Sequence, residues 1–377
     1  MTPPAPDPAQ PATGPPSPPA PTAPRRREYV PALDVIRIVA ILGVVAVHVV
    51  GGGVEDGSAP LGITAVDMAA SAAVPVFLMM AGALNLHPSA LRRGPGAFWR
   101  QRAVRILPAL VLWSAFYMLV IGPLAGAEMS VGTAIDQVIT GKTFTHLYFL
   151  WAIAGLYVIA PVIASFLHAV PEQEGRRAWG LGLLACAWTA LAFAVPYLTR
   201  QPSIEGLDSH RPIEPGSLTY WMAFAGYFVI GRAAIVAPVA RRWALAALAT
   251  TPVAIAALTW LYEAGRDDGG SLLVRTLRPD YSSPSVMVYA LLLFLALASL
   301  TGAWRVGPRA QAWLRALGNA TFGVFLVHFA VLVLLRQIPA LEGYDLWQMA
   351  TVWLVTVPVS FVIALVAQRV PGLRLIF

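Results

Sequence analysis

Two basic side chains near the amino terminus are spaced so that they share one face of an apolar helix. Arg37 and His48 are eleven residues apart, which is about 1,100° of helix rotation, so their directions differ by only about 20°. Along the axis they are about 16 Å apart. Both side chains are costly to bury in an apolar stretch, so we expect Arg37 and His48 to be a catalytic or proton-handling pair, with Asp34 as a further candidate. The alternative is a core histidine whose ring is satisfied by a neighbouring helix.

A second basic cluster lies before the third apolar stretch. Arg102 and Arg105 are spaced i, i+3 and therefore project from neighbouring positions on one helical face. Two guanidinium groups placed in this way can fork onto phosphate oxygens, which suits a bulky anionic ligand. The alternative interpretation is that Arg102 and Arg105, with Arg92, Arg93 and Arg100, only set membrane topology or contact anionic lipid.

Three further residues are weaker candidates. His146 opens an aromatic stretch, which an interfacial aromatic belt also explains. His328 is a second histidine inside an apolar stretch, and Asp67 lies within another. The sequence contains no HExxH pair, no CxxC and no phosphate-binding loop that ends in Gly-Lys-Ser/Thr. We therefore expect no metal site, no zinc hydrolysis and no P-loop use of ATP.

The composition indicates what must position these residues. Of 377 residues, 58% are hydrophobic and 12% charged, and the mean hydropathy is +0.67. A soluble globular protein is about 45–50% apolar and about 25% charged, so an ordinary soluble enzyme is excluded. The net charge of +7 would suit a nucleic-acid binder, but the basic residues lie in short clusters between apolar runs rather than on one soluble face. The sequence predicts a polytopic protein of the lipid bilayer that binds no nucleic acid.

The apolar runs predict an all-α membrane domain over residues 29–377. A stretch of about 20 apolar residues crosses about 30 Å of hydrocarbon as a helix. We predict ten such transmembrane helices, at about 32–52, 63–86, 106–125, 147–168, 178–198, 218–237, 243–262, 284–303, 318–337 and 347–368.

The basic residues predict the orientation of this domain. With the amino terminus inside, nineteen of the 26 Lys and Arg residues lie on the inner side, so the positive-inside rule places both termini in the cytoplasm. Residues 1–28 form a Pro-rich segment that we expect to be a disordered cytoplasmic tail, with no particular binding partner indicated. The single lysine among the basic residues is typical of a GC-rich bacterial genome, which favours a bacterial cell membrane.

Five segments, in this order along the chain, resemble the acyltransferase-3 family of integral membrane O-acyltransferases, most closely its stand-alone branch of surface-polysaccharide O-acetyltransferases. They are similar to that family's Arg-x10-His, VPxFFxxSG, Arg-x-x-Arg, HLWFL…LY…P and SYGIYLxH segments. The corresponding positions are 37–48, 74–82, 102–105, 146–161 and 321–328. Tyr148 stands where the family usually has tryptophan, and Ala81 and Thr321 stand where it usually has serine.

The resemblance implies a cytoplasmic acyl-CoA donor, commonly acetyl-CoA, and a hydroxyl of a glycan or glycolipid as acceptor, without a permanently bound cofactor. It implies that Arg102 and Arg105, helped by Arg37, hold the CoA phosphates and that the thioester extends toward His48. An imidazole with an ordinary pKa near 6.5 can take a proton from the attacking hydroxyl, or it can carry the acyl group itself. Two alternatives remain open: acyl tailoring of a small secondary metabolite, and a proton-coupled carrier or flippase in which His48 only relays protons.

Overall fold

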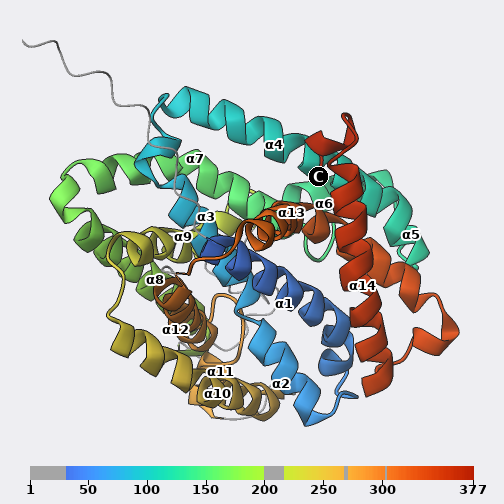
Figure 1. The fold of residues 1–377 in the computed structure, drawn as a ribbon. Helices are drawn as coiled ribbons and strands as arrows, with labels where there is room; N and C mark the ends of the chain where they lie inside the picture. The colour runs from blue at the N-terminus through green and yellow to red at the C-terminus, as the bar shows by residue number, and fades with distance from the viewer. Residues whose placement is uncertain (1–30, 199–215, 267–270, 302–303) are drawn as a thin grey trace, which may run out of the picture.

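The computed structural model describes residues 31–198, 216–266, 271–301 and 304–377, and every regular element in these ranges is a helix (Figure 1). The all-α prediction is therefore confirmed for the described part of the chain. The Pro-rich segment 1–28, predicted to be a disordered tail, lies outside the described residues.

Nine helical segments within the described residues are long and apolar enough to span a membrane. They are α1 (Pro31–Glu55), α2 with α3 (Leu61–Ala70 and Ala73–Asn85), α4 with α5 (Pro95–Phe116 and Gly122–Leu124), α7 (Tyr148–His168), α8 (Glu174–Leu198), α10 (Arg241–Ala264), α12 (Pro284–Thr301), α13 (Pro308–Arg336) and α14 (Leu346–Ala367). The tenth predicted stretch is also a helix, α9 (Tyr220–Val236), but its 17 residues make it shorter than the others. Each of the ten predicted stretches thus corresponds to a helix.

The second predicted span is broken where the sequence suggested one continuous helix. The break between α2 and α3 falls at Ser71 and Ala72. Pro75 has no N–H to bond the Ser71 carbonyl, and the Ser71 hydroxyl donates to the Met68 carbonyl oxygen at 2.7 Å. The regular helical hydrogen bonding is therefore interrupted before α3 begins, although Ser71 and Ala72 keep right-handed helical φ and ψ angles.

The third predicted span begins earlier than expected, at Pro95 rather than at 106. Gly94 has a φ of 86° and Pro95 occupies the first helical turn, where a missing N–H costs nothing. Arg102 and Arg105 lie on this helix, in agreement with their predicted position on one helical face. Past Phe116 the chain runs through one π-helical turn, η2 (Tyr117–Ile121), before α5. Two short helices, α6 (Val131–Thr140) and α11 (Leu272–Thr276), were not predicted.

Helices α3 and α9 cross at backbone contact in the middle of the bundle. A Cβ atom at Gly82 would overlap the backbone oxygen of Phe228, and one at Gly231 would overlap the backbone oxygen of Met79. Without a strong hydrophobic drive between helices in lipid, such close approach through small residues is a main source of helix association. Gly82 lies in one of the segments that resemble the acyltransferase-3 family.

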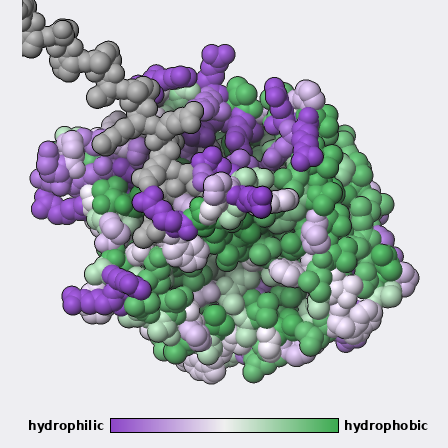
Figure 2. Space-filling model, in the orientation of Figure 1, coloured by the Kyte–Doolittle hydropathy of each residue, from purple (hydrophilic) through white to green (hydrophobic). Residues whose placement is uncertain are grey.

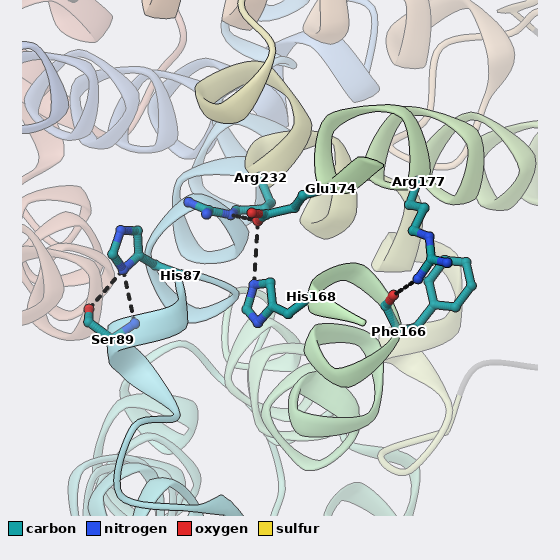
Figure 3. A network of polar contacts seen from close by, with 7 residues as sticks. All are labelled: His87, Ser89, Phe166, His168, Glu174, Arg177 and Arg232. Carbon is teal, nitrogen blue, oxygen red and sulfur yellow. Dashed lines mark hydrogen bonds and ion pairs between the residues drawn. The ribbon is translucent and has the colours of Figure 1, made fainter. Parts of the chain in front are cut away.

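A buried polar network joins α7, α8 and α9 (Figure 3). Arg232 of α9 is 5% exposed, and its Nε donates to Glu174 Oε1 of α8 at 2.7 Å. His168, the last residue of α7, places Nε2 3.4 Å from the same carboxylate oxygen. Because an unpaired charge in such surroundings is strongly unfavourable, the Arg232–Glu174 pair holds α8 and α9 together, and the His168 contact adds α7.

The outer surface is that of a membrane protein. Figure 2 shows apolar side chains over a broad part of one face, with hydrophilic side chains gathered at its upper left. Large apolar side chains on the spanning helices are well exposed, for example Val111 at 64% and Val158 at 62%. Water would make so much exposed apolar surface unfavourable, whereas lipid accepts it.

Candidate active site

Three histidines from distant parts of the chain lie together inside the bundle. His48 comes from α1, His146 lies two residues before the start of α7, and His328 is in α13. Their ring centroids are 5.4 Å apart for His48 and His328, 5.1 Å for His146 and His328, and 6.2 Å for His48 and His146. The sequence marked each histidine separately, and only the fold joins them into one cluster.

His328 is the most enclosed of the three, with no solvent exposure. Its Nδ1 lies 2.8 Å from the Phe325 carbonyl oxygen and 3.1 Å from that of Val324. A carbonyl can only accept, so Nδ1 carries the proton, and in a neutral ring Nε2 keeps the lone pair. Nε2 has no hydrogen-bond partner among the described residues. A buried lone pair is therefore held in a defined direction beside His48.

Tyr117, which the sequence did not single out, supports this arrangement. It lies in the π-helical turn η2 and has no solvent exposure. Its hydroxyl donates to the Leu326 carbonyl oxygen at 2.7 Å and accepts from the Ala330 N–H at 3.1 Å. These two groups flank His328 in α13, so the Tyr117 hydroxyl holds η2 against this part of the helix. No sequence signal marks a π-turn of this kind.

His48 and His146 line a cavity of about 610 Å³, here called the histidine cavity. Its wall also carries the carboxylates Glu55, Asp67 and Asp280. The predicted candidate Asp67 thus lies in the same cavity as two of the three histidines. His328 is behind this wall and does not line it.

A larger cavity, of about 1000 Å³, is here called the arginine cavity. Six arginines line it, namely Arg37, Arg92, Arg93, Arg100, Arg102 and Arg105, and its lining contains no carboxylate side chain. The cavity offers a strongly positive environment, which favours a polyanionic ligand.

Arg102 and Arg105 reach this cavity as the i, i+3 spacing predicts. The Arg102 guanidinium lies 5.4 Å from the Phe98 ring centroid and 5.5 Å from that of Tyr157. The Arg105 guanidinium lies 5.6 Å from the ring centroid of Phe322 on α13. Stacking on ring faces orients a guanidinium while leaving its N–H groups free for an anion.

Asp34 has a different place from the histidines. It is 7% exposed and packs against Gly318 of α13. Its Oδ1 accepts a hydrogen bond from Arg37 Nη1 at 3.2 Å. Asp34 therefore orients Arg37 at the arginine cavity instead of joining the histidine cluster.

Arg37 and His48 open into different cavities on the same side of α1. Arg37 lines the arginine cavity and His48 the histidine cavity, while Val44 between them lines both. The axial distance of about 16 Å thus separates two chambers along one helix face. Among the described residues no group of three or more His, Cys, Asp or Glu side chains could hold a metal ion.

This architecture defines an integral membrane protein with one positively charged and one histidine-lined cavity inside a helical bundle. A family model for an acyltransferase domain, that of the acyltransferase-3 family, matches residues 30–369. The chain belongs to the acyltransferase-3 family and is a membrane acyltransferase. The comparison with curated proteins and that with solved structures each gave no significant match.

Proposed function

We propose that the protein is an O-acetyltransferase of a bacterial cell membrane that transfers the acyl group of cytoplasmic acyl-CoA to a hydroxyl of a lipid-linked or cell-surface glycan. The observation that carries the proposal is that the arginine cavity and the histidine cavity adjoin along one face of α1. One cavity suits the anionic donor, and the other holds side chains able to move a proton.

The donor occupies the arginine cavity in this proposal. Coenzyme A carries several phosphate groups, and Arg102, Arg105 and Arg37 present guanidinium groups to the same space. Hydrogen bonds between charged partners contribute about 1.5–3 kcal/mol each. The basic residues concentrated around the arginine cavity support an orientation in which this cavity faces the cytoplasm. The pantetheine arm then extends along α1 toward His48.

The reaction forms one C–O bond and breaks one C–S bond. The acceptor hydroxyl oxygen attacks the thioester carbonyl carbon while His48 accepts the hydroxyl proton. The tetrahedral intermediate collapses, the carbon–sulfur bond breaks, and the proton passes from His48 to the departing CoA sulfur. The products are an acyl ester and free CoA. General base catalysis of this kind contributes about 10²–10⁴-fold.

His146 and His328 act in this proposal as positioning residues for His48. Both rings pack around it, and the Phe329 ring closes the group at a centroid distance of 5.0 Å from His48. A rigid enclosure keeps the His48 imidazole in one orientation. Good orientation of a reacting group is a large part of enzymatic rate enhancement.

The direct test is transfer of radiolabelled acetyl groups from acetyl-CoA to extracted glycolipids by the purified protein in lipid vesicles. His48→Ala should abolish transfer and leave acetyl-CoA binding intact. His87→Ala is the matched control, because His87 is exposed, lines neither cavity and contacts Ser89 (Figure 3). Near-normal transfer by His48→Ala would reject the role of His48. A wild-type protein that neither binds acetyl-CoA nor transfers label would reject the proposed function.

Two arms of the same assay address the alternatives. Label that becomes bound to the protein in the absence of acceptor would identify an acyl-histidine intermediate in place of direct transfer. Offering small hydroxylated metabolites instead of glycolipids tests the acceptor class, and the acceptor with the higher kcat/KM is the substrate class. Movement of glycolipid across the vesicle membrane without acetyl transfer would identify a carrier.

A further inference from the structure

Four apolar side chains line both cavities at once. They are Val44, Val74, Phe149 and Phe325, and each belongs to a different helix, α1, α3, α7 and α13 respectively. The two cavities have no other lining residue in common. These four residues, here called the collar, therefore form the wall between the cavities.

The collar is tightly packed. Val44 is 3% exposed and Phe325 is 6% exposed. The ring centroids of Phe149 and Phe325 are 5.2 Å apart with the planes at 54°. Aromatic rings at such a separation are in contact, so nothing passes between them unless a ring turns. The four parent helices are held together, since α1 packs against α3 and α13, and α3 packs against α7.

The collar separates two polar spaces. On one side lie the guanidinium groups of Arg37 and Arg105, and on the other lie the imidazoles of His48 and His146. A ring of apolar side chains between two cavities with charged or polar linings resists the passage of water and ions, as hydrophobic constrictions do in channels. In the proposed orientation the arginine cavity opens to the cytoplasm, and without such a wall it would join the histidine cavity in one continuous polar path through the bundle.

We propose that Val44, Val74, Phe149 and Phe325 form a hydrophobic gate that seals the two cavities from each other and limits the transferred acyl group to a short chain. The limit on chain length rests on the proposed function, because an acyl group whose donor is bound in the arginine cavity must pass the collar to reach His48. The seal does not depend on the reaction. In an apolar pocket, one methylene changes the ratio of kcat/KM between two substrates by about 10–200-fold. A collar that fits only a short acyl group therefore discriminates strongly against longer ones.

The acyl-length test compares acetyl-, propionyl-, butyryl- and hexanoyl-CoA as donors for wild-type protein and for Phe149→Ala and Phe325→Leu. Wild type should prefer acetyl-CoA, and both variants should gain kcat/KM for butyryl-CoA relative to acetyl-CoA by about 10-fold or more. Val74→Leu, which narrows the collar, should reduce use of propionyl-CoA relative to acetyl-CoA. Phe294→Leu is the matched control, because Phe294 is a buried phenylalanine of α12 that lines neither cavity.

The seal is tested separately in vesicles loaded with a pH-sensitive dye. Phe149→Ala combined with Phe325→Leu should raise the rate of proton leak at least several-fold over wild type and over Phe294→Leu. If the leak is unchanged in variants that keep wild-type thermal stability, the seal is refuted. If transfer occurs and its chain-length profile is unchanged, the selector is refuted. If wild type uses no acyl-CoA at all, the proposed function fails, while the leak result still decides on the seal.

Discussion

The substitution Tyr117→Phe removes one hydroxyl and leaves the ring, so it tests whether the support of α13 matters for catalysis. The hydroxyl makes two hydrogen bonds, to the Leu326 carbonyl oxygen at 2.7 Å and from the Ala330 N–H at 3.1 Å. His328 lies between these two positions and carries Nδ1 against the Phe325 carbonyl oxygen. Loss of the bridge therefore acts on the part of α13 that holds the histidine cluster.

The expected size of the effect follows from these contacts. A buried hydrogen bond contributes about 0.5–1.5 kcal/mol net, so the loss of the two Tyr117 hydroxyl hydrogen bonds lowers the free energy of unfolding by about 1–3 kcal/mol. The same loss removes the contact that holds η2 against α13, which lets the backbone on either side of His328 shift. A displacement of about 1 Å in an active site can cost about 10²-fold. We therefore expect kcat to fall by about 10–100-fold.

The assay is steady-state acetyl transfer with separate determination of kcat and of KM for acetyl-CoA. Since Tyr117 lines neither cavity, KM should stay within about two-fold of wild type while kcat falls. Tyr289→Phe is the control, because Tyr289 is also a buried residue and its hydroxyl donates to a backbone oxygen, that of Ala69, at 2.8 Å. A Tyr117→Phe protein with unchanged kcat, or one in which kcat falls no more than in Tyr289→Phe, would refute the positioning argument.

Three further outcomes are expected. The double variant Arg102→Ala with Arg105→Ala should weaken acetyl-CoA binding by about 10-fold or more at low salt. Calorimetric titrations should also show a smaller salt dependence of the affinity. An unchanged affinity would leave these arginines only a topological role. Glu174→Gln leaves the Arg232 charge buried without its carboxylate partner and should lower the free energy of unfolding by about 3–5 kcal/mol. The measurement is the midpoint of thermal unfolding, which should fall. An unchanged midpoint would mean that the ion pair adds nothing to stability. Gly82→Leu should prevent the close contact between α3 and the α9 backbone. Size-exclusion chromatography should then show little folded protein. A normal yield of monodisperse protein would contradict the close crossing.

Much of this protein follows from local patterns. Apolar length predicts the spanning helices, because a helix in lipid must satisfy its own backbone hydrogen bonds. The eleven-residue spacing of Arg37 and His48 predicts a shared direction, because helix geometry is nearly constant. The i, i+3 pair Arg102 and Arg105 likewise reaches one cavity. Where local chemistry is unusual, as at Pro75 and Pro95, the same reasoning misplaced a helix boundary.

The relation between helices was decided only by tertiary packing. Nothing in the separate surroundings of His146 and His328 indicates that their rings lie 5.1 Å apart, since each sits in an apolar stretch that fits many partners. The i, i+3 spacing already allows Asp34 to meet Arg37, but only the packing of α13 encloses Asp34 against Gly318. The sequence by itself determined a helical membrane protein with its charge concentrated in a few clusters. The packing of α1, α3, α7 and α13 turned those clusters into two cavities and placed a wall of four side chains between them, because side chains on different helices meet only when the bundle forms.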